Sequence, residues 1–150
     1  MPLLEQDVSR WDVKLIAEAD LLLVEAGTHN RFGRFQCEAA IQSVHAARRY
    51  SGKTDRHALA ALYAALVRLS PSIGARVGQA AASDPRDGLD MLDRIEPKAT
   101  EGYQPYFAVR ADLLRRLGRG DDAKAAYSRA IDLTHDPQLM RFLRDRMGET

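Results

Sequence analysis

The chain has 150 residues, of which 45% are hydrophobic, and its 22 basic and 21 acidic residues leave a formal net charge of +1. This size and composition predict one soluble domain with a substantial core. The balanced charge argues against a chain-wide attraction to nucleic acid or to an acidic membrane. The single cysteine, Cys37, excludes an internal disulfide bond and agrees with a reducing compartment.

The first half of the chain shows the periodicity of helices. Apolar residues recur every three or four positions in "RWDVKLIAEADLLLVEAG", where Ser9 can cap the helix and Gly27 can end it. A second helical pattern covers residues 35–47, and Thr54 or Asp55 can cap a third. We therefore expect three amphipathic helices before Pro71.

The second half continues in the same way. A weaker helix is expected in "IGARVGQAAAS", because two glycines inside it each cost about 1 kcal/mol relative to alanine. Pro85 stands at a natural first-turn position of the next helix. Three more helices are expected at residues 105–117, 121–134 and 137–147. No stretch alternates with the period of a strand, so the sequence predicts an all-α fold of about eight helices joined by short turns.

A weak internal repeat links two parts of this second half. An offset of 35 residues, close to the tetratricopeptide period of ~34, aligns two sets of small and large residues: Asp87, Gly88, Leu92 and Ile95 with Asp122, Ala123, Tyr127 and Ala130. The clearer unit is residues 104–137 and the eroded one is residues 71–97. We expect one helical-repeat domain over residues 1–150, with antiparallel helix pairs stacked as a short superhelix and capped by the last helix. The alternative is a generic helical bundle in which the similarity at 35 residues arises by chance.

Residues that carry catalysis or bind metals do not gather in the sequence. The four histidines lack metal-ligand spacing with one another or with Cys37: His29, His45, His57 and His135. The glycines of "HNRFGR" and "GRGDD" do not form a phosphate-binding loop. We expect no enzyme activity, no metal and no cofactor.

Arginines are the residues that stand out for binding. In a tetratricopeptide unit, counting from Phe107 places Asp112, Arg115 and Arg116 in the groove, with Arg119 beside them. A basic groove of this kind can receive an acidic segment of another protein, because the guanidinium fork suits carboxylates. Ordinary solvated arginines are the alternative interpretation.

The alternative function is that of a small-molecule sensor. A cavity among the first four helices, lined by Trp11, Phe35, Tyr50 and Tyr63, could hold a small effector that shifts the domain between two packings.

The ordered motifs "RWDVKLIAEAD", "FQCEAAIQSVHA", "LYAALVRLSPS", "ADLLRRLGRGDDAKAAYSRAIDL" and "RFLRDR" resemble the helical C-terminal extension of one group of bacterial extracytoplasmic-function RNA polymerase sigma factors. The resemblance covers residues 8–147, and the sigma regions that contact promoter DNA are absent from this chain. It implies a non-catalytic regulatory domain that tunes transcription initiation through protein contacts. A cytoplasmic location is expected separately, because the chain shows neither a signal peptide in "MPLLEQDVSRW" nor an apolar stretch of about 20 residues. The expected partners are sigma-factor regions or core RNA polymerase, in cis or in trans, with no direct contact to nucleic acid or membrane. Pairing of two chains into a homodimer is left open.

Overall fold

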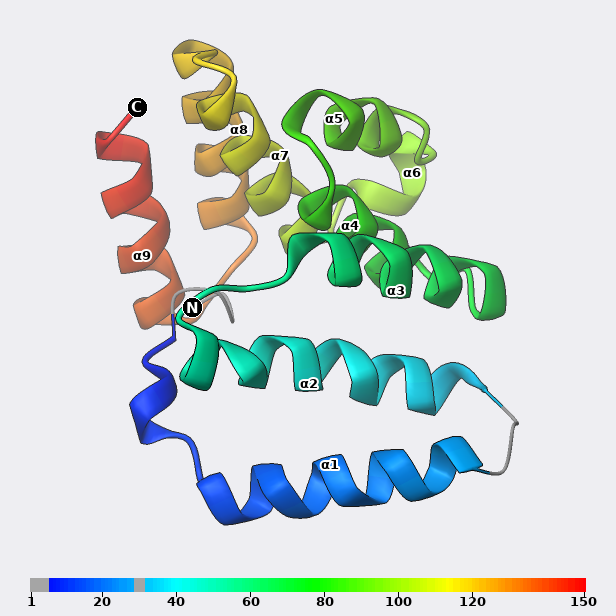
Figure 1. The fold of residues 1–150 in the computed structure, drawn as a ribbon. Helices are drawn as coiled ribbons and strands as arrows, with labels where there is room; N and C mark the ends of the chain where they lie inside the picture. Colours follow the sequence, from blue (N-terminus) through cyan, green and yellow to red (C-terminus); the bar gives the residue numbers. More distant parts are fainter. Residues whose placement is uncertain (1–5, 29–31) are drawn as a thin grey trace. The chain divides into compact units, whose positions relative to one another are not determined.

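The computed structural model describes residues 6–28 and 32–150, and every regular element in these ranges is helical (Figure 1). The predicted all-α fold of about eight helices is confirmed. Packing divides the chain into two compact units, Pro2–Pro71 and Ser72–Thr150. This is a finer division than the single domain expected over residues 1–150.

The first unit holds a short 3₁₀ turn and three helices. The turn spans Val8–Arg10, and helices α1, α2 and α3 span Val13–Thr28, Arg34–Ser51 and Arg56–Leu69. Helix α2 packs against α1, against α3 and against the 3₁₀ turn, so it is the central element of this unit.

Helix starts in this unit follow capping chemistry, with one change from the prediction. Asp55 caps α3, because its carboxylate accepts a hydrogen bond from the backbone N–H of Ala58 at 2.9 Å. Ser9 does not cap α1, since it lies inside the 3₁₀ turn and donates to Asp7. The carboxylate of Asp12 accepts from the first N–H groups of α1 instead, so the helix begins at Val13.

The second unit holds six helices, of which the helix from Pro97 to Thr100 is a single turn. Their bounds are α4 Ile73–Ala82, α5 Pro85–Asp93, α6 Pro97–Thr100, α7 Gln104–Arg116, α8 Gly120–Asp132 and α9 Pro137–Gly148. Helix α5 packs against α4 and α7, and α7 packs most extensively against α8. Helix α9 packs against α8, as expected of a terminal capping helix. Helix α6 was not predicted, because four residues are too few to show a period.

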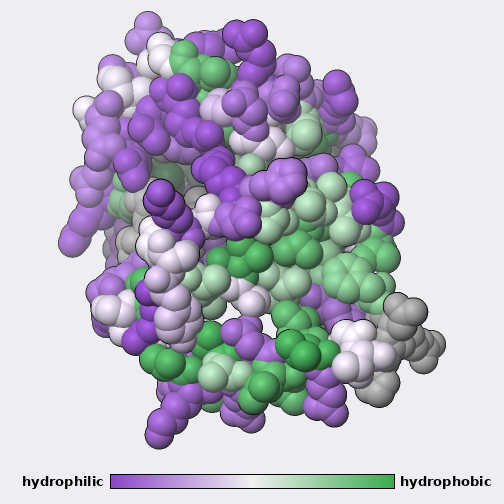
Figure 2. Space-filling model, viewed as in Figure 1, coloured by the Kyte–Doolittle hydropathy of each residue, from purple (hydrophilic) through white to green (hydrophobic). Residues whose placement is uncertain are grey.

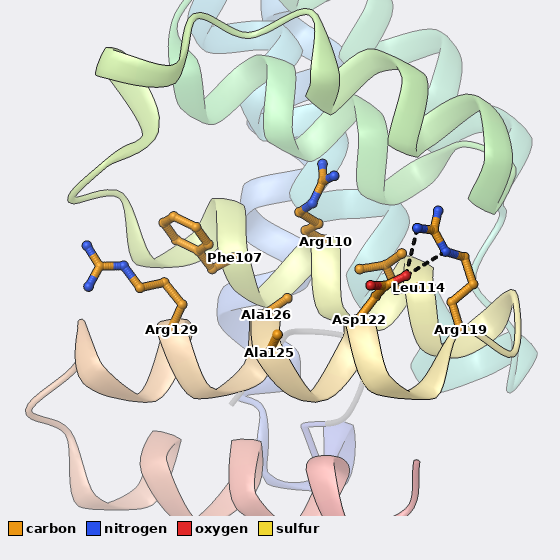
Figure 3. A pocket seen from close by; sticks show the side chains of 8 residues that line it. All are labelled: Phe107, Arg110, Leu114, Arg119, Asp122, Ala125, Ala126 and Arg129. Carbon is orange, nitrogen blue, oxygen red and sulfur yellow. Dashed lines mark hydrogen bonds and ion pairs between the residues drawn. The ribbon is translucent and has the colours of Figure 1, made fainter.

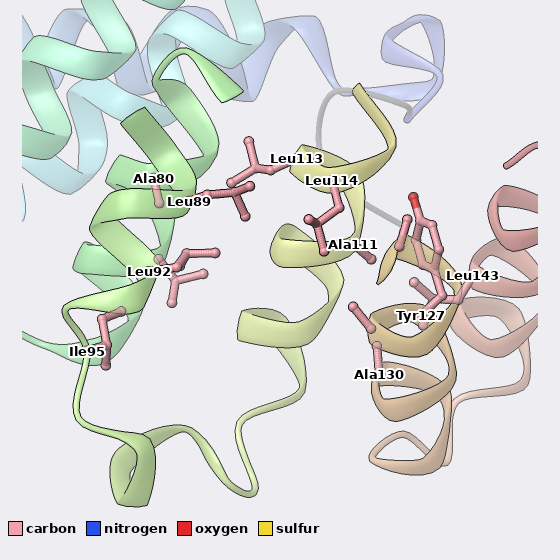
Figure 4. Packing of buried hydrophobic residues seen from close by; sticks show 13 residues of the cluster. Ala80, Leu89, Leu92, Ile95, Ala111, Leu113, Leu114, Tyr127, Ala130 and Leu143 are labelled. Carbon is pink, nitrogen blue, oxygen red and sulfur yellow. The ribbon is translucent and has the colours of Figure 1, made fainter. Parts of the chain in front are cut away.

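The core of the second unit follows the small-and-large pattern of the sequence. Ala111, Ala123 and Ala130 have no exposed surface, which lets the backbones of α7 and α8 approach closely (Figure 4). Tyr127 fills the space beside them and is 2% exposed, with Leu143 of α9 on its far side. The close packing of α7 on α8 is what brings their polar side chains together on the surface.

Gly88 marks the tightest helix contact in this unit. A β-carbon at this position would lie 2.5 Å from the carbonyl oxygen of Ala80 and 3.0 Å from a methyl group of Leu113. The carbonyl oxygen belongs to the backbone, so it cannot move aside for an added carbon as the end of a flexible side chain can. The absence of a side chain at residue 88 therefore allows α5 to sit against α4 and α7.

The Gly88→Ala variant is expected to lower the free energy of unfolding by about 1–3 kcal/mol, because overpacking outweighs the better helix propensity of alanine. Gly148→Ala is the matched control, since nothing lies within 4 Å of the added carbon at that helical position. Urea unfolding followed by circular dichroism measures both. Equal stability of Gly88→Ala and the parent chain would contradict this packing.

In the first unit, His45 is a polar side chain enclosed among apolar ones. It is 6% exposed, and its Nδ1 atom has no hydrogen-bond partner among the described residues. Burial, together with the nearby charge of Arg48, lowers the pKa of His45 below its ordinary value of 6.5. The imidazole is therefore neutral in the folded chain and takes up a proton more readily in the unfolded chain.

This difference predicts a loss of stability as the pH falls below about 6.5, because the unfolded state then binds more protons. Thermal unfolding between pH 7.5 and pH 5.5 should show the loss in the parent chain and a smaller one in His45→Gln. Replacement of the exposed His57 by glutamine should leave the pH dependence in place. Parallel pH profiles for the parent chain and His45→Gln would refute the assignment to His45.

Candidate functional site

A hollow of about 290 Å³ lies on the surface between α7 and α8 (Figure 3). Three arginines and one aspartate stand around an apolar floor, and we call this site the arginine hollow. Its lining residues are Phe107, Arg110, Leu114, Arg119, Asp122, Ala125, Ala126 and Arg129.

Each of the two helices contributes one stripe to the arginine hollow. Phe107, Arg110 and Leu114 follow one another at three- and four-residue steps on α7. Asp122, Ala126 and Arg129 do the same on α8. Seven residues of helix rise by about 10 Å, so the hollow is long enough for about three residues of an extended peptide.

The turn between the two helices positions Arg119 at one end of the hollow. Gly118 has a φ of 72°, a left-handed conformation that favours glycine. The N–H of Gly118 donates to the carbonyl of Arg115, and the N–H of Arg119 donates to that of Leu114, both at 3.0 Å. These two bonds form a Schellman motif, which ends α7 and holds the backbone of Arg119 at the start of α8.

Arg119 and Asp122 form an exposed ion pair at that end. The Nε and Nη2 atoms of Arg119 lie 2.9 Å and 2.7 Å from one carboxylate oxygen of Asp122, and both side chains are more than half exposed. Exposed pairs of this kind contribute about 0–1 kcal/mol. A carboxylate of a binding partner can therefore compete with Asp122 for Arg119 at little cost.

The opposite end is formed by Arg129 and Phe107. The guanidinium carbon of Arg129 lies 5.7 Å from the centre of the Phe107 ring, a cation–π arrangement. Its Nη2 atom also donates to the backbone carbonyl of Glu101 at 3.2 Å. The ring and the carbonyl together hold this guanidinium at the rim of the hollow.

Arg110 stands between the two ends and is the most constrained of the three arginines. Its guanidinium donates to Asp93 of α5 and approaches the hydroxyl of Tyr106. Burial is the largest single effect and opposes its charge, but the hydrogen bonds and charge interactions with Asp93 and Tyr106 together outweigh burial, so the pKa of Arg110 is raised. Arg110 thus stays charged while half-buried.

A second hollow of about 260 Å³ continues the site toward α5. It shares Arg110 and Arg119 with the arginine hollow and adds one further arginine and two carboxylates. The lining residues are Arg86, Leu89, Asp90, Asp93, Arg110, Leu117 and Arg119. Three arginines line each hollow, and the hollow between α7 and α8 has one aspartate where the second hollow has two.

The four residues predicted for a basic groove divide into two places. Only Arg119 lines the arginine hollow. Asp112 lies between Arg115 and Arg116, at 2.8 Å and 3.8 Å from their nearest nitrogen atoms. Arg115 also hydrogen-bonds with the hydroxyl of Tyr127. One carboxylate therefore neutralises much of the charge that the sequence pattern assigned to this surface.

The predicted effector cavity is not assembled by the four aromatic residues proposed for it. Phe35 and Tyr50 are 77% and 70% exposed, and fifteen residues of α2 separate them by about 22 Å. Trp11 and Tyr63 are half-buried, and burial raises the pKa of Tyr63. The cleft between α1 and α2 has a volume of about 280 Å³ and a different lining: Ile16, Ala19, Asp20, Leu23, Ala39, Gln42, Ser43 and Ala46.

Cys37 is enclosed in the first unit, where its thiol donates to the carbonyl of Leu62 at 3.1 Å. Burial, with a contribution from Glu38, raises the pKa of this thiol. Over residues 6–28 and 32–150, no three His, Cys, Asp or Glu side chains gather as metal ligands. Helices of this part of the chain are too short or too polar to cross a membrane. His29 lies outside the described residues.

Sequence reasoning missed Arg129 as a member of the site and gave Arg110 no specific place in it. The signal that could have found them is the matched spacing of the two helices, residues 107, 110 and 114 against residues 122, 126 and 129. Each set forms one row of polar and apolar side chains along its helix, and the two rows can face each other across a helix hairpin.

Comparisons with known proteins give one similarity. No protein-family model and no solved structure matches the chain. The chain is similar to an uncharacterized protein of Rhizobium meliloti (strain 1021), with 34% identity over 143 residues. The similarity covers 93% of this chain and 34% of that protein, so the chain spans about a third of the length of its relative.

Proposed function

We propose that this chain is a non-catalytic regulatory domain that binds an acidic segment of a protein in the arginine hollow. The observation that carries the proposal is the arrangement of Arg110, Arg119 and Arg129 around an apolar floor. Guanidinium groups bind carboxylates through paired hydrogen bonds, and such charge-assisted bonds are stronger than neutral ones.

The geometry favours an extended or helical segment with two acidic residues. Arg119 and Arg129 stand ten residues apart along α8, a rise of about 15 Å that two glutamate side chains of an extended segment can span by reaching outward. Two carboxylates three residues apart in an extended peptide are separated by about 10 Å. An apolar side chain between them would cover Leu114 and Ala126 on the floor.

Transcription initiation is the process in which we place this binding. The support is the resemblance of the ordered sequence motifs to the C-terminal extension of extracytoplasmic-function sigma factors. The relative in Rhizobium meliloti is about three times as long as the matched region, which is compatible with such a domain acting in cis within a longer polypeptide. The partner on this proposal is a sigma-factor region or core RNA polymerase, bound in cis or in trans.

The test is a binding measurement between the immobilised 150-residue chain and purified sigma regions or core RNA polymerase of Rhizobium meliloti. Reversal of two charges in Arg119→Glu with Arg129→Glu should weaken binding at least about tenfold, because two charge-assisted hydrogen bonds become repulsive contacts. Arg144→Glu, an exposed arginine of α9 outside the hollow, is the matched control and should bind as the parent chain does.

The same experiment separates the two arginine surfaces. Arg115→Glu with Arg116→Glu should have a small effect if the arginine hollow is the site. Loss of binding in that variant alone would move the site to the predicted groove around Asp112. No binding of the parent chain to either preparation would contradict the transcription partner.

A further inference from the structure

An apolar groove runs between α1 and α2 in the first unit. Its floor is the cleft of about 280 Å³, in which Ile16, Ala19 and Leu23 of α1 face Ala39 and Ala46 of α2. None of the 16 residues of α1 is buried, so α2 covers this helix only in part. Figure 2 shows apolar residues along α1, at the bottom of the view, and a gap between this helix and α2.

Two rows of side chains border this groove, and we call them the leucine row and the aromatic row. The leucine row is Leu15, Ala19 and Leu22, at four- and three-residue steps along α1. The aromatic row follows similar steps on α2, and its members are Phe35, Ala39, Gln42, Ala46 and Tyr50. The four large apolar side chains of the two rows are 59–77% exposed. Ala19 and Gln42 line the cleft and are exposed, so both rows open toward the same side.

The groove fits a helix better than an extended segment. The aromatic row is about 22 Å long, the length of four helical turns. Ser43 donates to Asp20 at 2.7 Å, which leaves Gln42 as the remaining polar side chain of the cleft lining. An extended segment would therefore bury backbone N–H and C=O groups without partners, whereas a helix satisfies its own. The alanines of both rows allow the backbone of a bound helix to approach closely.

Carboxylates surround this groove. Glu18 and Glu25 are seven residues apart on α1 and border the leucine row on its outer side. Asp20 lies in the floor of the cleft. None of the three forms an ion pair with a residue that the structure describes. Lys14 is the one basic residue of α1, so a bound segment meets three carboxylates and a single ammonium group there.

The basic residues of α2 are held away from these carboxylates. Arg34 pairs with Glu38 of its own helix at 2.8 Å. The guanidinium groups of Arg48 and Arg49 donate to backbone carbonyl groups of residues 6–11. The charge offered by the groove is therefore mainly negative, and basic side chains complement it.

The same charges argue against two other occupants. A symmetric pair of α1 helices along the leucine row would bring the Glu18 carboxylates of both copies together. An anionic membrane surface would meet carboxylates where a membrane-bound helix needs basic residues. The occupant that remains is a helix of different sequence with an apolar stripe and a basic flank.

We propose that the groove between α1 and α2 binds an amphipathic helix of another protein. Its apolar residues pack between the leucine row and the aromatic row, and its basic residues face Glu18 and Glu25. The inference is independent of the arginine hollow, which belongs to the other unit and binds the opposite charge.

Two designed peptides of about 18 residues test the proposal with the full 150-residue chain. Both carry leucine at the a and d positions of each heptad, and the flanking positions are lysine in one and glutamate in the other. Fluorescence anisotropy of the labelled peptides should show the lysine peptide binding at least about tenfold more tightly, with a gain of helix in circular dichroism. Equal binding of the two peptides, or no binding of the lysine peptide at about 300 μM chain, overturns the proposal.

Neutral variants locate the bound peptide. Leu22→Gln and Phe35→Gln should each weaken binding of the lysine peptide at least about fivefold, because each removes an apolar border of the groove. Val24→Gln is the matched control, since Val24 is 70% exposed and lies on the opposite side of α1. Circular dichroism checks that each variant keeps its helices. Equal weakening by all three variants, or by none, contradicts the assigned groove.

A charge reversal tests the basic flank of the partner. Glu18→Lys with Glu25→Lys should reverse the preference, so that the glutamate peptide binds more tightly than the lysine peptide. Glu96→Lys with Glu101→Lys changes the net charge equally at two exposed residues of the other unit and should keep the parent preference. An unchanged preference in the first variant overturns the assignment of the flank.

Sedimentation equilibrium of the peptide-free chain decides against the remaining occupant. The expected mass is that of a monomer at about 100 μM. A dimer that Leu22→Gln dissociates would assign the groove to a second copy and overturn the proposal.

Discussion

The contact between α7 and α8 is the constraint on which the second unit depends. Alanines at residues 111, 123 and 130 remove the bulk that would hold the two backbones apart, and Tyr127 fills the remaining volume beside α9. The left-handed turn at Gly118 ends α7 and connects it to α8. Because the helices lie so close, residues seven apart on each of them face a common hollow, and three guanidinium groups meet there.

The three arginines of this hollow differ in how tightly neighbouring groups hold them. Arg110 is tied to Asp93 and Tyr106, so its guanidinium is held in one place and is already paired with a carboxylate. Arg119 is held only by an exposed pair with Asp122, and Arg129 by a ring and a carbonyl oxygen. On the other side of α7, Asp112 is shared by Arg115 and Arg116. Each surface thus has one arginine more than the carboxylates paired with it. The arginine hollow differs in its apolar floor and in Arg129, which a ring and a carbonyl oxygen hold in place of a carboxylate.

Local patterns in the sequence predicted much of the fold, and tertiary contacts decided the rest. Periodicity and capping residues located the long helices, including the start of α3 at Asp55 and the first turn of α5 at Pro85. The sequence could not show that Ser9 belongs to a separate turn, or that the packing divides near residue 71.

Within the candidate site, Arg119 was predicted, but Arg115 and Arg116 look equally available in the sequence. Their sharing of Asp112 depends on side-chain positions that only the folded helix provides. The aromatic residues of the first unit were grouped by type, and the length of α2 keeps Phe35 and Tyr50 apart.

The central claim is that the arginine hollow binds carboxylates presented by a protein segment. The most direct measurement is a titration of the isotope-labelled 150-residue chain with a short peptide carrying two glutamates three residues apart, followed by backbone amide NMR shifts. The account predicts that the shifts concentrate at residues 107–129 around the hollow and disappear at 500 mM salt, since the contacts are exposed and electrostatic. Shifts centred on Asp112, Arg115 and Arg116, or on residues 6–71, would contradict it.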